Sequence, residues 1–223
     1  MRKALFFSAV SKYFLGVFLV ALLLFLPAGT LRYWNGWLLM AVLFIPIFFA
    51  GCILMVKNPS LLKKRLDAKE PQKEQSKIVK YSGLMFLAGF ICAGLNFRFS
   101  NFLLPRPLSI AASFLFLLSY LLYGEVLREN TYLSRTVEVQ EGQQVISTGM
   151  YSIVRHPMYS ATLVMFLSIP LILGSLLSFL IFLAYPMLIA ARIRHEETLL
   201  AEELTGYRDY MTRVKYRLIP FLW

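Results

Sequence analysis

The chain consists of long apolar runs separated by short polar segments. The apolar runs cover residues 4–26, 34–56, 81–97, 108–127 and 159–191. A helix of about 20 consecutive apolar residues spans the hydrocarbon core of a bilayer. Each of the first four runs therefore predicts one membrane helix.

The last run is too long for a single straight span. It contains Pro170 and then Gly174 and Ser175 near its middle. Proline lacks a backbone N–H and glycine is conformationally free, so both residues tend to interrupt a helix. We therefore predict two short helices that form a hairpin over 159–191, with both ends of the hairpin on the same side of the membrane.

The composition excludes a soluble domain of this size. Of the 223 residues, 58% are hydrophobic, and the mean hydropathy is +0.64. A soluble domain of this length lacks the interior volume to bury so much apolar surface. The predicted fold class is all-α: a polytopic membrane helical bundle of four full spans, a C-terminal helical hairpin and a cytosolic amphipathic tail over 192–223.

The distribution of charge orients the predicted helices. The net charge is +11, and lysines are concentrated in the loop at 57–80. Positively charged loops tend to remain in the cytoplasm. We therefore expect this loop, the N-terminus, the C-terminus and the open end of the hairpin to be cytoplasmic. In a membrane protein, such a charge indicates topology and contact with anionic lipids rather than binding of nucleic acid.

A polar segment at 129–155 precedes the hairpin. Within it, residues 137–140 and 144–146 alternate weakly between apolar and polar side chains. This alternation favours a short β-hairpin or an extended cover. The segment is the longest part of the C-terminal half without a membrane pattern.

Polar side chains gather at both ends of the predicted hairpin. They are Arg155, His156 and Tyr159 at its entry, and Arg192, Arg194, His195, Glu196 and Glu197 at its exit. Because a hairpin brings its two ends together, we expect these groups to converge. Charged residues at a membrane helix end also reach to water without any function, and this explanation suits Arg192 at least as well. Adjacent helical residues point about 100° apart, so at most one of Glu196 and Glu197 should face a shared pocket squarely.

The entry to the hairpin has the features of an anion site. His156 is followed by Pro157, and proline suits the first position of a new helix. The free N–H groups of that first turn would join Arg155 and His156 in attracting an anion. We predict no metal site, since His156 and His195 are the only histidines and no cluster has metal-ligand spacing. A serine nucleophile elbow and a glycine-rich phosphate loop are also missing from the sequence.

Several short motifs follow one another in the C-terminal half of the chain. They are Gly149-Met150-Tyr151, Arg155-His156-Pro157-Met158-Tyr159, Glu196-Glu197, Gly206-Tyr207, Tyr210 and the basic stretch at 213–220. In order and spacing they resemble the isoprenylcysteine carboxyl methyltransferase and phospholipid methyltransferase superfamily of integral membrane enzymes. The resemblance covers roughly residues 130–223, and the first four spans agree with the superfamily only in general character.

The resemblance implies S-adenosylmethionine as the methyl donor, bound on the cytosolic side. It places N-terminal transmembrane helices at 1–128 and a cofactor-binding region at 129–223. The implied cofactor-binding residues are Gln140, Gln143, Val145, Ile146, Tyr151, Arg155, His156, Pro157, Met158, Tyr159 and Glu197, with Glu196 as the alternative to Glu197. The alignment around Gln140 and Gln143 is loose, because eukaryotic members typically carry histidine where Gln143 stands. The family's substrate-side arginine most nearly matches Arg194, with Arg192 as an alternative.

The chemistry of this cofactor agrees with the candidate residues. Its carboxylate suits Arg155, His156 and a helix N-terminus, its ammonium suits a glutamate, and its sulfonium suits tyrosine faces. Methyl transfer is an in-line displacement, so alignment of the two reactants is most of the task. A carboxylate acceptor needs no base, whereas a protonated amine must first lose a proton, which His195 or Glu196 could accept.

We therefore expect a membrane methyltransferase whose acceptor is lipidic or lipid-anchored, either an isoprenylcysteine-like carboxylate or a phospholipid amine. Two alternatives remain open. The first is an NADPH-dependent membrane reductase of related architecture, with the arginine-rich tail near the ribose phosphate. The second is a non-catalytic transporter or assembly protein, which would need polar groups deep in the first four spans. Few are found there beyond Asn96 and Glu125 near the helix ends.

Overall fold

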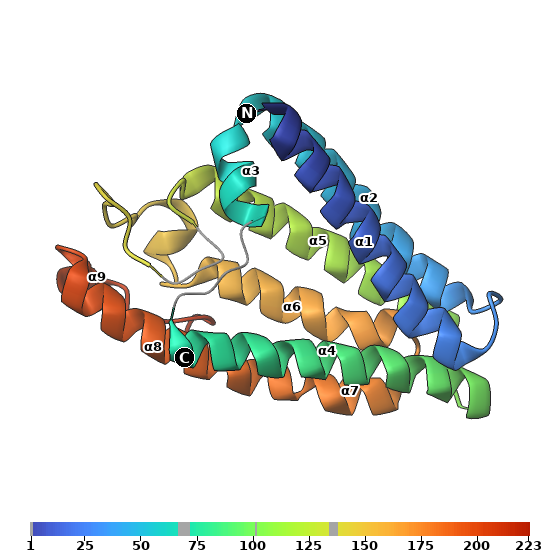
Figure 1. Ribbon diagram of the computed structural model, residues 1–223. Coiled ribbons are helices and arrows are strands. Elements are labelled where there is room, and N and C mark those ends of the chain that lie inside the picture. Colours follow the sequence, from blue (N-terminus) through green and yellow to red (C-terminus); the bar gives the residue numbers. More distant parts are fainter. Residues whose placement is uncertain (1, 67–71, 101, 134–137) are drawn as a thin grey trace.

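The protein is a bundle of long helices, described here for residues 2–66, 72–100, 102–133 and 138–223 of a computed structural model. Within these residues there are helices and turns but no strand. The helices are α1 (Arg2–Ala28), α2 (Trp34–Lys57), α3 (Pro59–Leu66), α4 (Lys73–Phe99), α5 (Arg106–Glu129), α6 (Pro157–Ile172), α7 (Leu176–Phe182), α8 (Ala184–Glu203) and α9 (Tyr207–Arg213), with a short 3-10 helix at Gly149–Ser152. Figure 1 shows the long helices running side by side.

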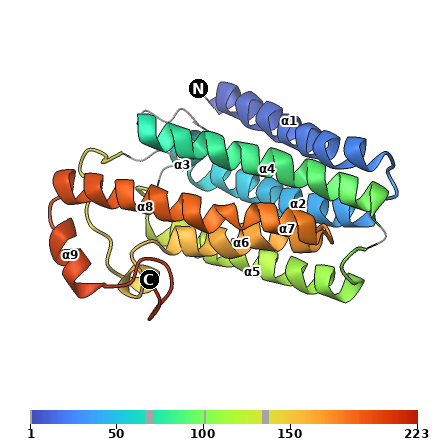
Figure 2. The same ribbon diagram turned by 90° about the horizontal axis from the view of Figure 1, so that it is seen from below.

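Five helices of the described chain are long and apolar enough to cross a membrane. Four of them are α1, α2, α4 and α5, at the positions of the four predicted spans. The fifth is the combined stretch Leu176–Glu203, formed by α7 and α8, while α6 is shorter. The predicted class of a helical membrane bundle is confirmed, and the two ends of the chain lie at the same end of the bundle (Figures 1 and 2).

The predicted hairpin is present, and its break lies where the sequence placed it. Helix α6 ends at Ile172, Gly174 adopts a φ of 72°, and the hydroxyl of Ser175 accepts a hydrogen bond from the Ser178 amide to cap α7. The second arm is longer than predicted, because α7 and α8 continue to Glu203. Pro186 lies in the first turn of α8, a position where its missing N–H breaks no hydrogen bond of the helix.

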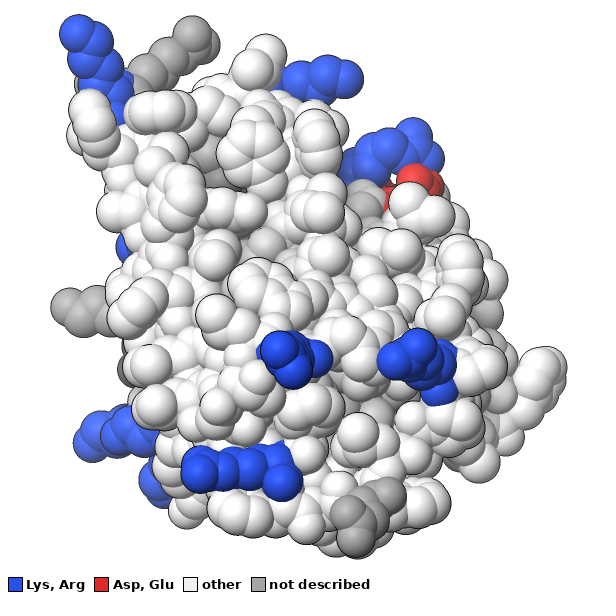
Figure 3. All heavy atoms as spheres, turned by 90° about the vertical axis from the view of Figure 1, so that its right-hand side faces the viewer, with Lys and Arg blue, Asp and Glu red and all other residues white. Residues whose placement is uncertain are grey.

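Three neutral side chains fasten the turn of this hairpin to the neighbouring helices. The Tyr33 hydroxyl donates to the Leu173 carbonyl at 2.7 Å, and Asn35 Nδ2 donates to the Ile172 carbonyl at 2.7 Å. Ser109 accepts a second hydrogen bond from Asn35 at 3.1 Å and donates to the Leu171 carbonyl at 3.1 Å. These bonds satisfy the last carbonyl groups of α6, which have no partner within the helix. Figure 3 views the bundle from this end, where charged residues are few and mostly basic.

Close helix packing explains how the hairpin is held along its length. Helix α6 lies along α5, while α4 contacts α1, α7 and α8. At Gly89 on α4 an added Cβ would lie 2.3 Å from the Phe182 ring, so only glycine permits this approach of α4 to α7. The hairpin is thereby packed into the bundle, and the residues at its open end have fixed positions.

Several boundaries differ from the sequence-based expectation. Helix α4 begins at Lys73 rather than near residue 81, and the basic loop at 57–80 contains the unpredicted helix α3. The expected β-hairpin is not formed by residues 138–148, which instead make a turn closed by a 3.0 Å bond from the Gln143 amide to the Gln140 carbonyl. Residue 137, at the start of the alternating stretch, lies outside the described residues. Of the two expected forms, the described residues therefore support an extended cover and not a β-hairpin.

Candidate functional site

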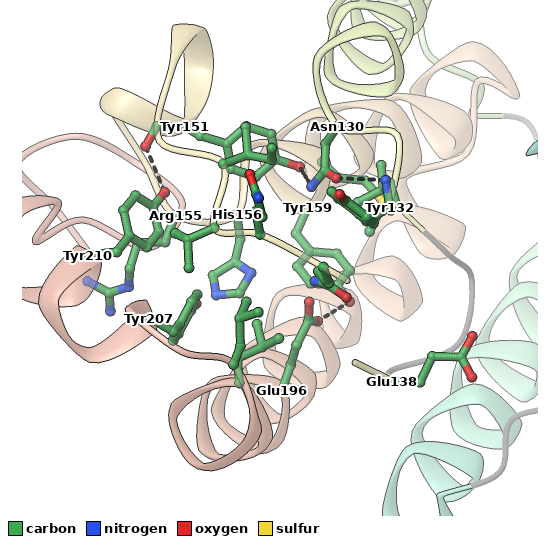
Figure 4. Close-up of a pocket in the computed structure, with 18 of the residues that line it drawn as sticks. Asn130, Tyr132, Glu138, Tyr151, Arg155, His156, Tyr159, Glu196, Tyr207 and Tyr210 are labelled. Carbon is green, nitrogen blue, oxygen red and sulfur yellow. Dashed lines mark hydrogen bonds between the residues drawn. The ribbon is translucent and has the colours of Figure 1, made fainter. Parts of the chain in front are cut away.

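A cavity opens at the end of the bundle where the two arms of the hairpin meet. Its volume is about 100 Å³, which is below the roughly 300–1,000 Å³ typical of ligand pockets. The start of α6, the end of α8, helix α9 and the segment after α5 form its walls (Figure 4). The lining residues are Asn130, Tyr132, Leu133, Glu138, Gln143, Gln144, Val145, Ile146, Tyr151, Arg155, His156, Met158, Tyr159, Arg192, Glu196, Leu200, Leu204, Tyr207 and Tyr210.

An ionic cluster joins two residues that line the cavity, Arg155 and His156, to Glu197 and Arg217, which do not line it. Arg155 Nε donates to Glu197 Oε1 at 2.6 Å, and His156 Nε2 lies 3.2 Å from the same oxygen. Arg217 Nε donates to Oε2 at 2.7 Å. The Glu197 side chain is only 4% exposed, so both of its oxygens are bonded within the protein. The two ends of the hairpin therefore converge as predicted, but Glu197 supports the wall and does not line the cavity.

The tail at 214–218 runs along the start of α6 and holds it through backbone oxygens. The hydrogen bonds join Arg155 Nη1 to the Val214 (2.7 Å) and Lys215 (2.9 Å) carbonyls, the amides of Arg155 and His156 to the Tyr216 and Arg217 carbonyls (both 2.9 Å), and Ser160 Oγ to the Leu218 carbonyl (2.6 Å). Arg155 is 7% exposed, and these carbonyls share its charge with Glu197. The basic stretch at 213–220 marks this region in the sequence, but its pattern does not predict the contact.

A second group, the rim cluster of Tyr159, Arg192 and Glu196, lines the cavity directly. The Tyr159 hydroxyl donates to Glu196 Oε2 at 2.6 Å and accepts a hydrogen bond from Arg192 Nε at 2.8 Å. Arg192 and Glu196 are four residues apart on α8, so they share one face of the helix. The Tyr159 ring stacks on the His156 ring, with centroids 5.7 Å apart, and so connects the two clusters.

Tyrosine side chains make up much of the cavity lining. Tyr151 accepts a hydrogen bond from Asn130 Nδ2 at 2.9 Å, and the Tyr210 hydroxyl donates to the Tyr151 carbonyl at 2.7 Å. Tyr207 is 4% exposed, and its hydroxyl has no partner among the described residues. Burial raises the pKa of the Tyr210 hydroxyl to about 12 and raises the pKa values of Tyr151 and Tyr207 as well. These hydroxyls are therefore neutral near pH 7.

Most of the predicted site residues line this cavity. They are Gln143, Val145, Ile146, Tyr151, Arg155, His156, Met158, Tyr159 and Glu196. The lining also contains residues that the sequence did not single out as site residues, among them Asn130, Tyr132, Leu200, Tyr207 and Tyr210. The three-residue spacing of Tyr207 and Tyr210 was the available signal for these two, because it places both rings on one face of α9.

Five predicted site residues do not line the cavity, each for a local reason. Pro157 begins α6 and is buried there, and Glu197 belongs to the ionic cluster. The Gln140 side chain is bonded to Lys64 Nζ and to the Tyr132 carbonyl, so it holds the turn over the cavity. Arg194 and His195 are exposed on other faces of α8, since a helix turns about 100° per residue. Of the two candidate arginines on α8, Arg192 faces the cavity and Arg194 does not.

Metal binding finds no support in the part of the chain that the structure describes. No group of three or more His, Cys, Asp or Glu side chains is placed there to hold an ion. Besides the tyrosines, the ionisable groups that line the cavity are Arg155, His156, Arg192, Glu138 and Glu196. Both signs of charge are present beside aromatic faces, an arrangement suited to a ligand that carries a carboxylate and a cationic group.

Comparison with known proteins identifies relatives of this membrane bundle. Residues 107–205 match a family model described as phospholipid methyltransferase. A curated relative, Delta(14)-sterol reductase TM7SF2 of Mus musculus, is 29% identical over 137 residues, which cover 53% of this chain and 33% of the relative. The chain therefore matches about a third of the length of that protein. The similarity to the phospholipid methyltransferase family therefore rests on residues 107–205, which are less than half of the chain.

Proposed function

We propose that this protein is an S-adenosylmethionine-dependent methyltransferase that acts on a lipidic or lipid-anchored acceptor. The observation that carries the proposal is the convergence of Arg155, His156 and Tyr159 with Glu196 around one cavity. The family match at 107–205 covers all four residues. The cavity lies at an end of the helical bundle, where a cofactor from water can meet an acceptor from the bilayer.

The residues of the cavity fit the chemical groups of this cofactor. Arg155, His156 and the N-terminus of α6 suit its carboxylate. The tyrosine faces suit its sulfonium by cation–π attraction. When bound, S-adenosylmethionine supplies an electrophilic methyl group. In this arrangement Glu197 acts as a positioning residue, because its oxygens hold Arg155 and Arg217.

Glu196 fits the acceptor side of the reaction. Its Oε2 atom is fixed by the Tyr159 hydroxyl, which Arg192 orients from the other side. A phospholipid amine arrives as an ammonium and must give up one proton before its nitrogen attacks the methyl group, and a carboxylate at this place can accept that proton. An isoprenylcysteine-like carboxylate would need no base and would be oriented by Arg192.

Equilibrium binding and label transfer test the proposal together. The purified protein in lipid nanodiscs is titrated with S-adenosylmethionine by calorimetry. It is then incubated with the radiolabelled cofactor and either phosphatidylethanolamine or a farnesylated cysteine. We expect micromolar binding and label in one of the two acceptors. A protein that binds no cofactor and labels neither acceptor would contradict the proposal.

A reductase is the second candidate, because the similar mouse protein is a Delta(14)-sterol reductase. The rim cluster and the unpaired Tyr207 hydroxyl would then face a nicotinamide cofactor. Titration of the same nanodiscs with NADPH separates the two candidates. Binding of NADPH without binding of S-adenosylmethionine would favour the reductase.

A further inference from the structure

Tyr207 differs from the other tyrosines of the cavity in one respect. The hydroxyls of Tyr132, Tyr151, Tyr159 and Tyr210 all take part in hydrogen bonds with neighbouring groups of the chain. The Tyr207 hydroxyl is buried and meets no partner among the residues that the structure describes. Buried polar groups without a partner are rare in folded proteins, and each one calls for a specific explanation.

The backbone around Tyr207 fixes the position of its ring. Gly206 adopts a φ of 83°, a left-handed conformation that favours glycine and lets the chain reverse sharply after α8. The Tyr207 amide donates to the Leu204 carbonyl at 3.1 Å, and the ring packs against Tyr210 with centroids 5.6 Å apart. The ring therefore lies in the cavity wall, packed against Tyr210.

The surroundings of this hydroxyl determine what it can bind. Burial and the nearby carboxylates of Glu197 and Glu196 raise its pKa, so the hydroxyl keeps its proton and serves as a donor. Arg155 also lies close enough for its charge to act on Tyr207, and Figure 4 shows Tyr207 next to Arg155 and His156. Glu197 is already paired with Arg155 and Arg217, so the acceptor oxygen that this donor lacks has to come from a ligand.

We propose that the Tyr207 hydroxyl donates a hydrogen bond to the carboxylate of the bound methyl donor, beside Arg155 and His156. This assignment rests on the proposed function. Tyr207 thereby acts as a specificity residue, because a ligand without the carboxylate leaves the hydroxyl unpaired. The proton stays on the tyrosine, and no covalent bond is made or broken in this contact.

The first test compares Y207F with the matched variant Y210F. Removal of an unpaired hydroxyl should leave the unfolding temperature of the ligand-free protein unchanged or raise it. Removal of the Tyr210 hydroxyl should lower that temperature, because the Tyr151 carbonyl loses its donor. A hydrogen bond to a charged group contributes more free energy than one between neutral groups. Y207F should therefore bind S-adenosylmethionine about 10- to 100-fold more weakly than the wild type, as measured by calorimetry.

The second test identifies the group on the ligand. S-adenosylmethioninamine is the same molecule without the carboxylate, and the wild type should bind it much more weakly than S-adenosylmethionine. For Y207F the difference between the two ligands should shrink by the same 10- to 100-fold. Unchanged binding of S-adenosylmethionine by Y207F, an equal loss for both ligands, or a Y207F protein that no longer folds would overturn the assignment alone. A wild type that binds neither ligand would overturn the proposed function and the assignment together.

Discussion

The two ends of the α6–α8 hairpin are held in different ways. At the turn, neutral side chains from α2, α5 and the loop before α2 donate to the backbone carbonyls at 171–173. At the open end, charged side chains bind one another in the ionic cluster and the rim cluster. Neutral bonds to a helix end are sufficient for structure, whereas buried charges carry a large desolvation cost. The costly arrangement lies beside the cavity, where the proposed function requires charged groups.

The same contrast divides two adjacent residues on α8. Glu197 is 4% exposed and bonded to arginines on both oxygens. Glu196 is half-buried, lines the cavity and receives only the Tyr159 hydroxyl at Oε2 among the bonds described. Glu197 therefore supports the wall of the cavity, whereas Glu196 faces the space that a ligand would occupy. Substitutions at the two positions should therefore have different effects.

The largest effect is expected for E197A. The variant leaves the buried Arg155 without its carboxylate, and removal of one partner of a buried ion pair costs about 3–5 kcal/mol. We expect a strongly lowered unfolding temperature in detergent and loss of S-adenosylmethionine binding in calorimetry. E197Q keeps the shape of the side chain and should retain part of the stability. A stable E197A protein with normal affinity would show that the ionic cluster does not hold the site.

A smaller and more selective effect is expected for E196Q. The amide keeps the hydrogen bond with Tyr159 but cannot accept a proton, and loss of general base catalysis lowers rates by about 10²–10⁴-fold. For an amine acceptor, kcat should fall by this factor while the unfolding temperature changes little. The rate with a carboxylate acceptor should be much less sensitive. An E196Q protein that unfolds as easily as E197A would remove the distinction between the two glutamates.

Substitutions at the turn of the hairpin should lower the stability of the protein without changing its affinity for the ligand. The variant N35A leaves the Ile172 carbonyl without this donor, and a buried unpaired group costs about 1–3 kcal/mol. We expect a lower unfolding temperature with an unchanged dissociation constant for S-adenosylmethionine. The nearby S109A variant, which removes the bond to the Leu171 carbonyl, serves as the matched comparison. A weaker affinity in N35A would mean that the two ends of the hairpin are coupled.

The sequence predicted the parts of this molecule that depend on local patterns. Gly174 and Ser175 marked the break of the hairpin, and the hairpin in turn predicted that His156 and Glu197 would meet, as they do at 3.2 Å. The sequence did not predict which face of α8 lies against the cavity. That face is set by how the unbroken helix from Ala184 packs in the bundle. In the structure, Arg192 and Glu196 face the cavity, while Arg194 and His195 face outward.

Contacts between distant segments were likewise beyond the sequence pattern. The tail at 214–218 bonds to the backbone at 155–156, and no periodicity records such a pairing. The unpaired hydroxyl of Tyr207 is also a property of the assembled cavity, because it depends on what four other segments place around it. The motif containing Gly206 and Tyr207 indicated a position worth examining but gave no role for it.

The tail has a consequence for the order in which the protein can mature. The membrane helices can insert one after another as they leave the ribosome, but the carbonyl partners of the Arg155 side chain lie at residues 214 and 215. A chain still under synthesis would thus possess its full set of membrane spans while the wall of the cavity stayed unfinished. Under the proposed function, a chain that stops before residue 214 would therefore lack part of the wall that binds the methyl donor.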